Sequence, residues 1–331
     1  PVHQDVLHEV MSAMQNSFGN PSSIHAFGRE ARKQLNEARR QLAKTISAKE
    51  NEIIFTSGGT EADNMAILGV SRGYQHKGKH LITTVIEHHA VLHTFESLEK
   101  EGFEVTYLKV DEQGRISLDE LKAALREDTI LVSVMFGNNE VGTIQDVEAI
   151  GALLQDHHAF FHTDAVQAYG IAPIDVNHLH IDLLAVSSHK INGPKGVGFL
   201  YCREGISLMP VMYGGEQERK RRAGTENLPA ILGFTKAAVI AQDSMDEKQV
   251  LYKQFKQRMQ SIFAEEGIDF SVNGSIEHSL PHVLNVSFPG TNVEAMLVNM
   301  DLAGIAVSSG SACTAGSIDP SHVLVAMFGK N

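Results

Sequence analysis

Short apolar runs alternate with helical patterns between residues 50 and 201. Strands are predicted at Glu52–Thr56, His80–Thr84, Glu104–Leu108, Ile130–Met135, Ala159–Thr163, Leu183–Val186 and Gly198–Tyr201. Apolar residues recur at helical spacing between most of them, at Glu61–Val70, Leu92–Glu101, Ser117–Arg126 and Val147–Asp156. Strands that alternate with helices predict βαβ units and a largely parallel sheet, so we expect an α/β fold.

The rest of the chain has a different pattern. A long helical stretch covers residues 228–265, and two short β-like runs, Phe270–Val272 and Val283–Ser287, precede a helix near 293–303. We therefore expect a large domain over residues 1–247 and a smaller α+β domain over 248–331. The alternative for the first ~15 residues is that they belong to the smaller domain. Ligands of parallel sheets bind beyond the carboxyl ends of the strands, so candidate chemistry is sought there.

Composition narrows the function classes. The formal charge of −12 argues against direct binding to nucleic acid or an anionic membrane. No apolar run approaches the ~20 residues of a membrane-spanning helix, and no signal peptide is expected. Only two cysteines, Cys202 and Cys313, are present, which excludes a disulfide framework and a multi-cysteine zinc site. A reducing, cytoplasmic setting is expected.

Five polar segments follow predicted strands, and each has a simple alternative. Thr56–Glu61 is suited to an anion at a helix N-terminus, or is an ordinary helix cap. For His88, in Glu87–Ala90, the simple interpretation is a solvated histidine. For Gly137–Glu140 it is a turn.

The other two segments are His162–Gln167 and Ser187–Gly196. Asp164 either caps the next helix or meets a cationic ring nitrogen, and Lys190 is either solvated or a Schiff-base lysine. Together the five segments provide an anion cradle, a carboxylate for a ring nitrogen, an aromatic stacking group and a reactive lysine. This combination predicts a site for pyridoxal phosphate.

At these motifs the chain resembles the cysteine desulfurases, NifS- and IscS-like enzymes of the class-V aminotransferase group with PLP fold type I. The resemblance extends over almost the whole chain, and its markers are Gly19–Ser23, Ser57–Asn64, Glu87–His88, Asn138–Gly142, Asp164–Gln167, Ser188–Lys190, Arg222–Thr225 and Ser308–Cys313. It implies an aspartate-aminotransferase-like fold, with a large mostly parallel α/β/α domain and a smaller α+β domain.

The resemblance also implies roles for the residues. Lys190 would hold pyridoxal phosphate and move protons, Asp164 would pair with the pyridine nitrogen, and Gln167 would bond the phenolic oxygen. His88 would stack on the ring and act as an acid or base, and Asn139 would lie near the substrate. The phosphate would be held by Gly59, Thr60, Ser187 and His189.

Two further implications concern other subunits and partners. Thr225 would reach the phosphate of a neighbouring subunit, which implies a homodimer. Cys313, in a loop of small residues, would attack the sulfur of L-cysteine, release L-alanine and carry a persulfide to an acceptor protein, either an iron–sulfur scaffold or a tRNA-thiolating enzyme. No intrinsic metal is expected, although the resemblance implies that Cys313 transiently ligates an iron–sulfur cluster. Cys202 is interpreted as a buried strand residue.

Other interpretations stay open at this stage. The same fold suits a selenocysteine lyase or a class-V aminotransferase, and the chain could also be an inactive module that docks on a sulfur acceptor. The basic run Arg219–Arg222 is interpreted as a solvated loop near the dimer interface. The family's N-terminal Asp-Asn segment and C-terminal substrate-binding arginine are absent, so both ends of the chain are expected to be truncated.

Overall fold

The computed structural model describes residues 1–310 and 320–329. Its strands are β1 (Ile53–Thr56), β2 (His80–Thr84), β3 (Glu104–Leu108), β4 (Thr129–Ser133), β5 (Phe160–Asp164), β6 (Leu183–Ser187), β7 (Gly198–Cys202), β8 (Ser271–Asn273) and β9 (Asn285–Ser287). Its α-helices are α1 (Gln4–Asn16), α2 (Ala26–Lys44), α3 (Gly59–Tyr74), α4 (His89–Lys100), α5 (Leu118–Ala124), α6 (Val147–Leu154), α7 (Leu228–Asp243), α8 (Met245–Glu265), α9 (Val293–Leu302) and α10 (His322–Phe328).

A seven-stranded sheet is the centre of the fold, with the order β1-β7-β6-β5-β4-β2-β3. Every neighbouring pair is parallel except those of β7, which is antiparallel to both β1 and β6. The predicted largely parallel sheet is therefore confirmed, and each predicted strand occurs within one or two residues of its expected bounds. The direction of β7 could not be read from its apolar pattern, because that pattern is the same in either direction.

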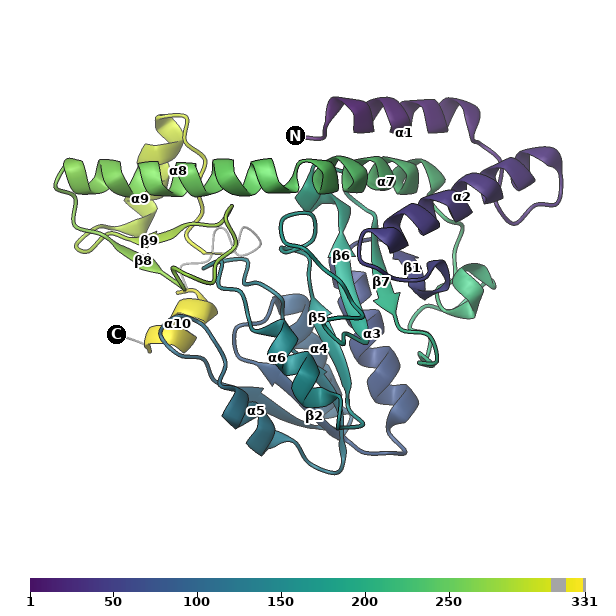
Figure 1. Cartoon of the computed structure of the whole chain (residues 1–331), viewed down its shortest axis with the longest axis horizontal. Helices are drawn as coiled ribbons and strands as arrows, with labels where there is room; N and C mark the ends of the chain where they lie inside the picture. Colours follow the sequence, from purple (N-terminus) through teal and green to yellow (C-terminus); the bar gives the residue numbers. More distant parts are fainter. Residues whose placement is uncertain (311–319, 330–331) are drawn as a thin grey trace.

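Helices cover both faces of this sheet, so its strands are apolar on both sides. In β7, Phe199 and Tyr201 join the core formed with α2 and α7, while Leu200 and Cys202 join the core formed with α3 and α4. Side chains alternate between faces along a strand, which explains how one short run supplies both cores. The result is the expected three-layer α/β/α arrangement (Figure 1).

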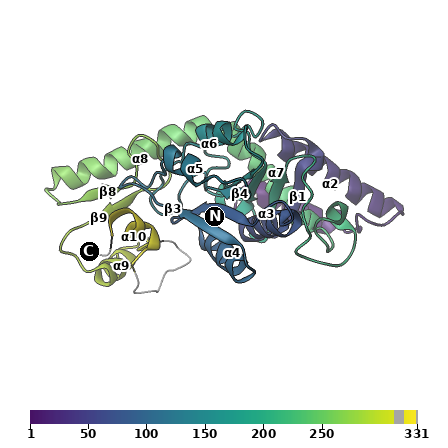
Figure 2. The ribbon, with the colours of Figure 1, turned by 90° about the horizontal axis from the view of Figure 1, so that it is seen from below.

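The remaining elements extend to one side. Helices α7 and α8 form a nearly continuous rod, interrupted only at Ser244, and α1 packs along α7 (Figure 1). In Figure 1 the small hairpin of β8 and β9 and helix α10 lie below α8, while α9 crosses behind α8. Figure 2 shows α9 and α10 on the side of the hairpin that faces away from α8. The domain boundary at residue 247 stays a prediction.

Helix α10 contacts the large part of the molecule through a separate apolar cluster. Val323 and Met327 of α10 are buried against Ile86, Met135 and Val141, which lie in the loops after β2 and β4. This contact holds the beginning of α10 beside the carboxyl ends of the strands. No helix among the described residues has the length and apolarity needed to cross a bilayer.

Candidate active site

The predicted site residues come together at one edge of the sheet. Thr56 of β1 and Ser187 of β6 both pair with Gly198 of β7, which brings the ends of these strands side by side. Asp164 is the last residue of β5, and its carbonyl accepts a hydrogen bond of 2.9 Å from the N–H of Phe136, just beyond β4. The parallel topology therefore gathers segments that are far apart in the sequence.

The first turn of α3 forms an anion cradle. Gly58 precedes the helix at a φ of 151°, and no side chain caps the helix. A Cβ on Gly59 would lie 2.5 Å from Cγ2 of Val166, and one on Gly58 would lie 3.6 Å from Oγ of Ser187. A Cβ at Gly59 would collide with Val166, and the φ of Gly58 favours glycine. The uncapped N–H groups favour a negatively charged group such as phosphate.

Ser187 and His189 lie together beside this cradle, with 2.8 Å between Ser187 Oγ and His189 Nδ1. Burial, followed by the positive charges of Lys190 and Lys195, lowers the pKa of His189. Thr60, in the first turn of α3, is exposed. These groups are the ones that the sequence predicts to hold the phosphate of pyridoxal phosphate.

Asp164 is a buried carboxyl close to the predicted cofactor lysine. Its Oδ1 accepts a hydrogen bond of 2.9 Å from the N–H of Val166. Burial raises the pKa of Asp164 to about 6, while the hydrogen bond from Val166 and the charge of Lys190 act in the opposite direction. A cationic ring nitrogen placed here would lower that pKa further, so the carboxyl fits a pyridinium partner.

Lys190 lies in a 3-10 turn, Ser188–Ile191, directly after β6. The turn ends at Asn192, which adopts a left-handed conformation with a φ of 63°. The lysine side chain is exposed, and no ion pair joins it to another residue within 1–310 or 320–329. Among these residues the amine of Lys190 is therefore unpaired, and its charge acts on the nearby carboxyl of Asp164.

His88 precedes α4 and caps it, because its Nδ1 accepts a hydrogen bond of 3.1 Å from the N–H of Ala90. Burial, then the charge of Lys190, lowers the pKa of His88, so the ring is neutral at pH 7. With Nδ1 used as an acceptor, the proton of the neutral ring is assigned to Nε2. The geometry suits a neutral ring next to a flat cofactor.

The remaining predicted residues are distributed more widely. Gln167 is half-buried, and its Oε1 lies 3.2 Å from Nε2 of His282. Asn139 is half-buried, and Thr225 is exposed on the loop before α7. Cys313 lies outside the described residues.

The basic run Arg219–Arg222 is only partly the solvated loop that the sequence predicts. Arg219 and Lys220 are exposed, but Arg221 and Arg222 are half-buried. Arg221 donates to the carbonyl of Asn51, and Arg222 forms an ion pair of 2.7 Å with Glu61 in the first turn of α3. The interpretation is wrong for these two residues because the carbonyl of Asn51 and the carboxylate of Glu61 bind their side chains, and the local sequence does not reveal these distant partners.

Several buried polar residues under the site were not singled out from the sequence. Glu87 is fully buried, and its pKa is raised to about 8, mainly by burial. Asp63 of α3 lies 3.4 Å from His162 of β5, and burial raises the pKa of Asp63 while lowering that of His162 to about 3. Burial therefore disfavours the charged form of both Asp63 and His162. Their only sequence signal is that they adjoin the predicted residues.

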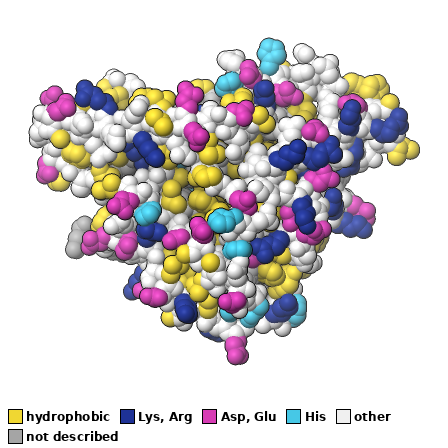
Figure 3. Space-filling model, viewed as in Figure 1, with side chains coloured by type: hydrophobic (Ala, Val, Ile, Leu, Met, Phe, Trp, Pro, Cys, Tyr) yellow, Lys and Arg dark blue, Asp and Glu magenta, His cyan; other side chains and the backbone are white. Residues whose placement is uncertain are grey.

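Both signs of charge are spread over the face shown in Figure 3, with Lys and Arg side chains gathered over the end where α2 lies. No group of three or more His, Cys, Asp or Glu side chains suited to a metal ion occurs in the described part of the chain.

Comparison with known proteins gives the class of this fold and site. The Aminotransferase class-V family matches residues 1–329. A solved "NIFS-LIKE PROTEIN" superposes with a TM-score of 0.93 at 36% identity, over 99% of this chain and 87% of that one. The structure "SspA in complex with cysteine" superposes with a TM-score of 0.84 at 36% identity, over 98% of this chain and 91% of that one.

A curated relative narrows the family of this chain within the class-V aminotransferases. "Putative cysteine desulfurase IscS 1" of Bacillus subtilis (strain 168) is 60% identical over 330 residues, which is 100% of this chain and 87% of the relative. The chain therefore belongs to the class-V aminotransferases and, within them, to the cysteine desulfurases, which are pyridoxal-phosphate-dependent enzymes.

Proposed function

We propose that this cysteine desulfurase converts L-cysteine to L-alanine and stores the released sulfur as a persulfide on Cys313. The observation that carries the proposal is the arrangement of Lys190, Asp164 and His88 around the glycine cradle at the end of β1. The relatives named cysteine desulfurase support the same reaction.

The residues present fit pyridoxal phosphate. The cradle at Gly58 and Gly59, with Thr60, Ser187 and His189, would hold the phosphate, and Asp164 would hold the ring nitrogen. Gln167 and Asn139 would bond the phenolic oxygen and the substrate. When bound, pyridoxal phosphate supplies an electron sink for negative charge that develops at the substrate's α-carbon.

Side chains of this chain would carry the proton transfers. Nζ of Lys190 would attach the cofactor and then move a proton at the α-carbon of cysteine. His88 would act as an acid or base toward the substrate, and as an acid only after its neutral ring has taken up a proton.

Sulfur transfer to Cys313 balances without an external oxidant. A bond forms between the sulfur of Cys313 and that of the substrate, and the substrate's carbon–sulfur bond breaks. The electron pair of that bond and one proton remain with the β-carbon, which becomes the methyl group of alanine. The attacking group is the thiolate, so Cys313 must lose its proton first.

We further infer a homodimer in which Thr225 contacts the phosphate of the second subunit. Apolar side chains exposed on and between α1 and α2 support a second copy as the partner, and these are Leu7, Met11, Met14, Phe18, Ile24 and Phe27. The persulfide would pass by protein contact to an iron–sulfur scaffold or a tRNA-thiolating enzyme in the cytoplasm. Cys313 would ligate an iron–sulfur cluster only transiently.

The test uses the Cys313→Ala variant and radiolabelled cysteine. The variant should transfer no labelled sulfur to either type of acceptor, while its visible cofactor absorbance is unchanged. Normal sulfur transfer by the variant would reject the proposal. Amino-group transfer in place of alanine and sulfide production would instead indicate an aminotransferase.

A further inference from the structure

His282, between the two strands of the small hairpin, contacts a residue of the predicted cofactor site. Its Nε2 lies 3.2 Å from Oε1 of Gln167, in the loop after β5. Gln167 is the side chain that would bond the phenolic oxygen of pyridoxal phosphate. The two residues are 115 positions apart in the sequence, so only the packing of the hairpin loop against the large sheet brings them together.

This contact determines which end of the Gln167 amide is left for the cofactor. Desolvation, followed by the positive charges of Lys256 and Lys190, lowers the pKa of His282 to about 4, so the ring is neutral at pH 7. An amide oxygen can only accept, so the ring proton is assigned to Nε2, which donates to Oε1 of Gln167. The amide nitrogen remains, and it is the only atom of the amide that can donate to a phenolic oxygen.

The loop that carries His282 is attached to the segment after β4. The N–H of Leu280 donates a hydrogen bond of 2.7 Å to the carbonyl of Gly142. The N–H of Ile144 donates one of 2.8 Å to the carbonyl of His278. Leu280 is also fully buried in the core formed with α2 and α7. The backbone two residues before His282 is therefore held both by packing and by hydrogen bonds.

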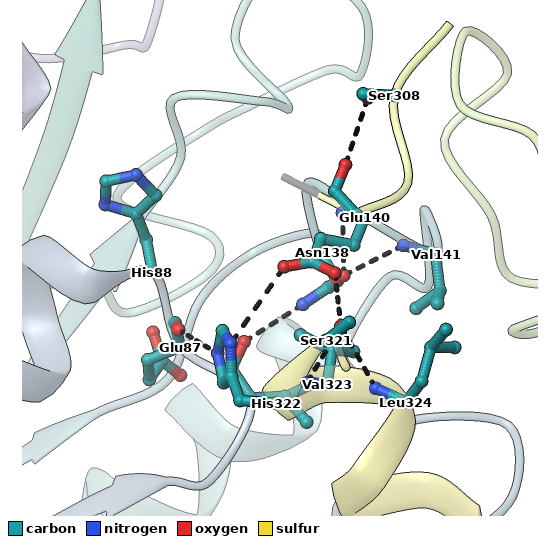
Figure 4. A network of polar contacts seen from close by, with 12 residues as sticks. Glu87, His88, Asn138, Glu140, Val141, Ser308, Ser321, His322, Val323 and Leu324 are labelled. Carbon is teal, nitrogen blue, oxygen red and sulfur yellow. Dashed lines mark hydrogen bonds and ion pairs between the residues drawn. The ribbon is translucent and has the colours of Figure 1, made fainter. Parts of the chain in front are cut away.

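The segment after β4 is itself fixed by the buried side chain of Asn138. Its Oδ1 accepts hydrogen bonds of 2.9 Å from the N–H groups of both Glu140 and Val141 (Figure 4). Its Nδ2 donates a hydrogen bond of 3.0 Å to the carbonyl of Ile86, in the loop after β2. The loop of His282 consequently rests on a support that is joined to the edge of the sheet.

Helix α8 provides a second attachment for the same loop. Nζ of Lys256 donates hydrogen bonds of 2.6 Å to the carbonyl of Leu280 and of 3.3 Å to Oγ of Ser279. The ring of Tyr252, one turn earlier in α8, lies 6.4 Å from that of His282, centre to centre. His282 is thus placed opposite Gln167 by contacts from the sheet and from α8.

We propose that His282 is a positioning residue for the cofactor, which holds the amide of Gln167 so that its nitrogen donates to the phenolic oxygen. The inference rests on the proposed function, in which Gln167 contacts that oxygen. A hydrogen bond donated to a phenolic oxygen stabilises its ionised form. Without the donor at His282 the amide is free to rotate, and a rotated amide presents an oxygen that gives no such stabilisation.

The test compares His282→Phe, His282→Gln, Gln167→Ala and the double variant Gln167→Ala/His282→Phe with the wild-type holoenzyme. Phenylalanine keeps a ring without a donor, whereas glutamine has an N–H donor on a side chain of similar reach. Absorption spectra over a range of pH give the midpoint at which the visible absorbance of the bound cofactor changes. His278→Phe is the matched control, because His278 is an exposed histidine of the same loop.

We expect His282→Phe to raise this midpoint by about 0.5–1 pH unit, because the phenolic oxygen loses a well-oriented donor. His282→Gln should remain close to the wild type, and His278→Phe should match it. Gln167→Ala should raise the midpoint as well. The double variant should raise it no further than Gln167→Ala alone, since His282 acts only through Gln167.

Different results separate this inference from the proposed function. If Gln167→Ala raises the midpoint and His282→Phe does not, the positioning role is rejected while the cofactor contact of Gln167 stands. The role is also rejected if His282→Gln raises the midpoint as far as His282→Phe, or if the two changes add in the double variant. If the wild type binds no pyridoxal phosphate, or Gln167→Ala leaves the midpoint unchanged, that part of the proposed function fails and this inference fails with it.

Discussion

Arg39 and Glu218 form a two-point ion pair, with both nitrogen–oxygen distances at 2.7 Å. The Glu218 side chain is 1% exposed and also accepts a hydrogen bond of 3.0 Å from the N–H of Phe55. Arg39 additionally donates to the carbonyl of Ile53 at 2.7 Å. The pair therefore connects α2, β1 and the loop that leads to Thr225.

Glu218→Ala should lower the free energy of unfolding by about 3–5 kcal/mol, because it leaves the charge of Arg39 without its partner in a buried setting. Denaturation in urea measures this difference. The control is Glu204→Ala, since Glu204 pairs with Lys49 where both side chains are more than half exposed. An exposed pair contributes about 1 kcal/mol or less, so equal losses in the two variants would contradict the prediction.

Lys190→Ala should purify without the visible absorbance of covalently held cofactor, because no amine remains at the end of β6 to form the link. Absorption spectra of the purified protein before and after addition of pyridoxal phosphate test this. Lys195→Ala is the control, since Lys195 is also exposed and lies in the next loop. A wild-type spectrum from Lys190→Ala would reject Lys190 as the attachment point.

Glu87→Gln should remove part of the pH dependence of stability. Burial raises the pKa of Glu87 to about 8 in the folded state. Between the ordinary pKa of glutamate and pH 8, the folded protein keeps a proton that the unfolded chain releases. The wild type is therefore fully stabilised at low pH and loses this contribution as pH rises through about 8.

Glutamine does not titrate, and its oxygen can accept the same hydrogen bonds from Met135 and Thr84. The free energy of unfolding of Glu87→Gln relative to wild type should increase by about 2–4 kcal/mol between pH 5 and pH 8. Urea denaturation at both pH values measures it. Parallel pH profiles for the two proteins would show that Glu87 is not the titrating group.

Cys202→Ala should keep full sulfur transfer. Cys202 is 1% exposed in β7, and burial raises the pKa of its thiol to about 12. The thiol is therefore protonated and inaccessible to a thiol reagent at pH 8. The substitution removes one buried sulfur and should lower the free energy of unfolding by about 1–2 kcal/mol. Loss of persulfide formation in this variant would show that Cys202, and not only Cys313, takes part.

Much of the fold is encoded in local patterns. Strands such as β2 and β3 begin and end at their predicted residues, because short β-forming runs bounded by polar turns can be recognised from the sequence alone. Lys190, Asp164 and His88 could be found because each directly follows such a run, and parallel topology places strand ends together. Cys202 was correctly interpreted as buried for the same reason.

Other features depend on contacts between distant residues. The antiparallel direction of β7, the partial burial of Arg221 and Arg222, and the buried contact between Asp63 and His162 have no local signature, because they depend on which distant segments pack together.

The sequence by itself determined the α/β class and the burial of Cys202, because periodicity is a local property. Its motifs predict the cofactor residues and the role of Cys313. The tertiary structure decided which polar groups are buried together, since burial and electrostatic coupling arise only when separate segments pack against each other.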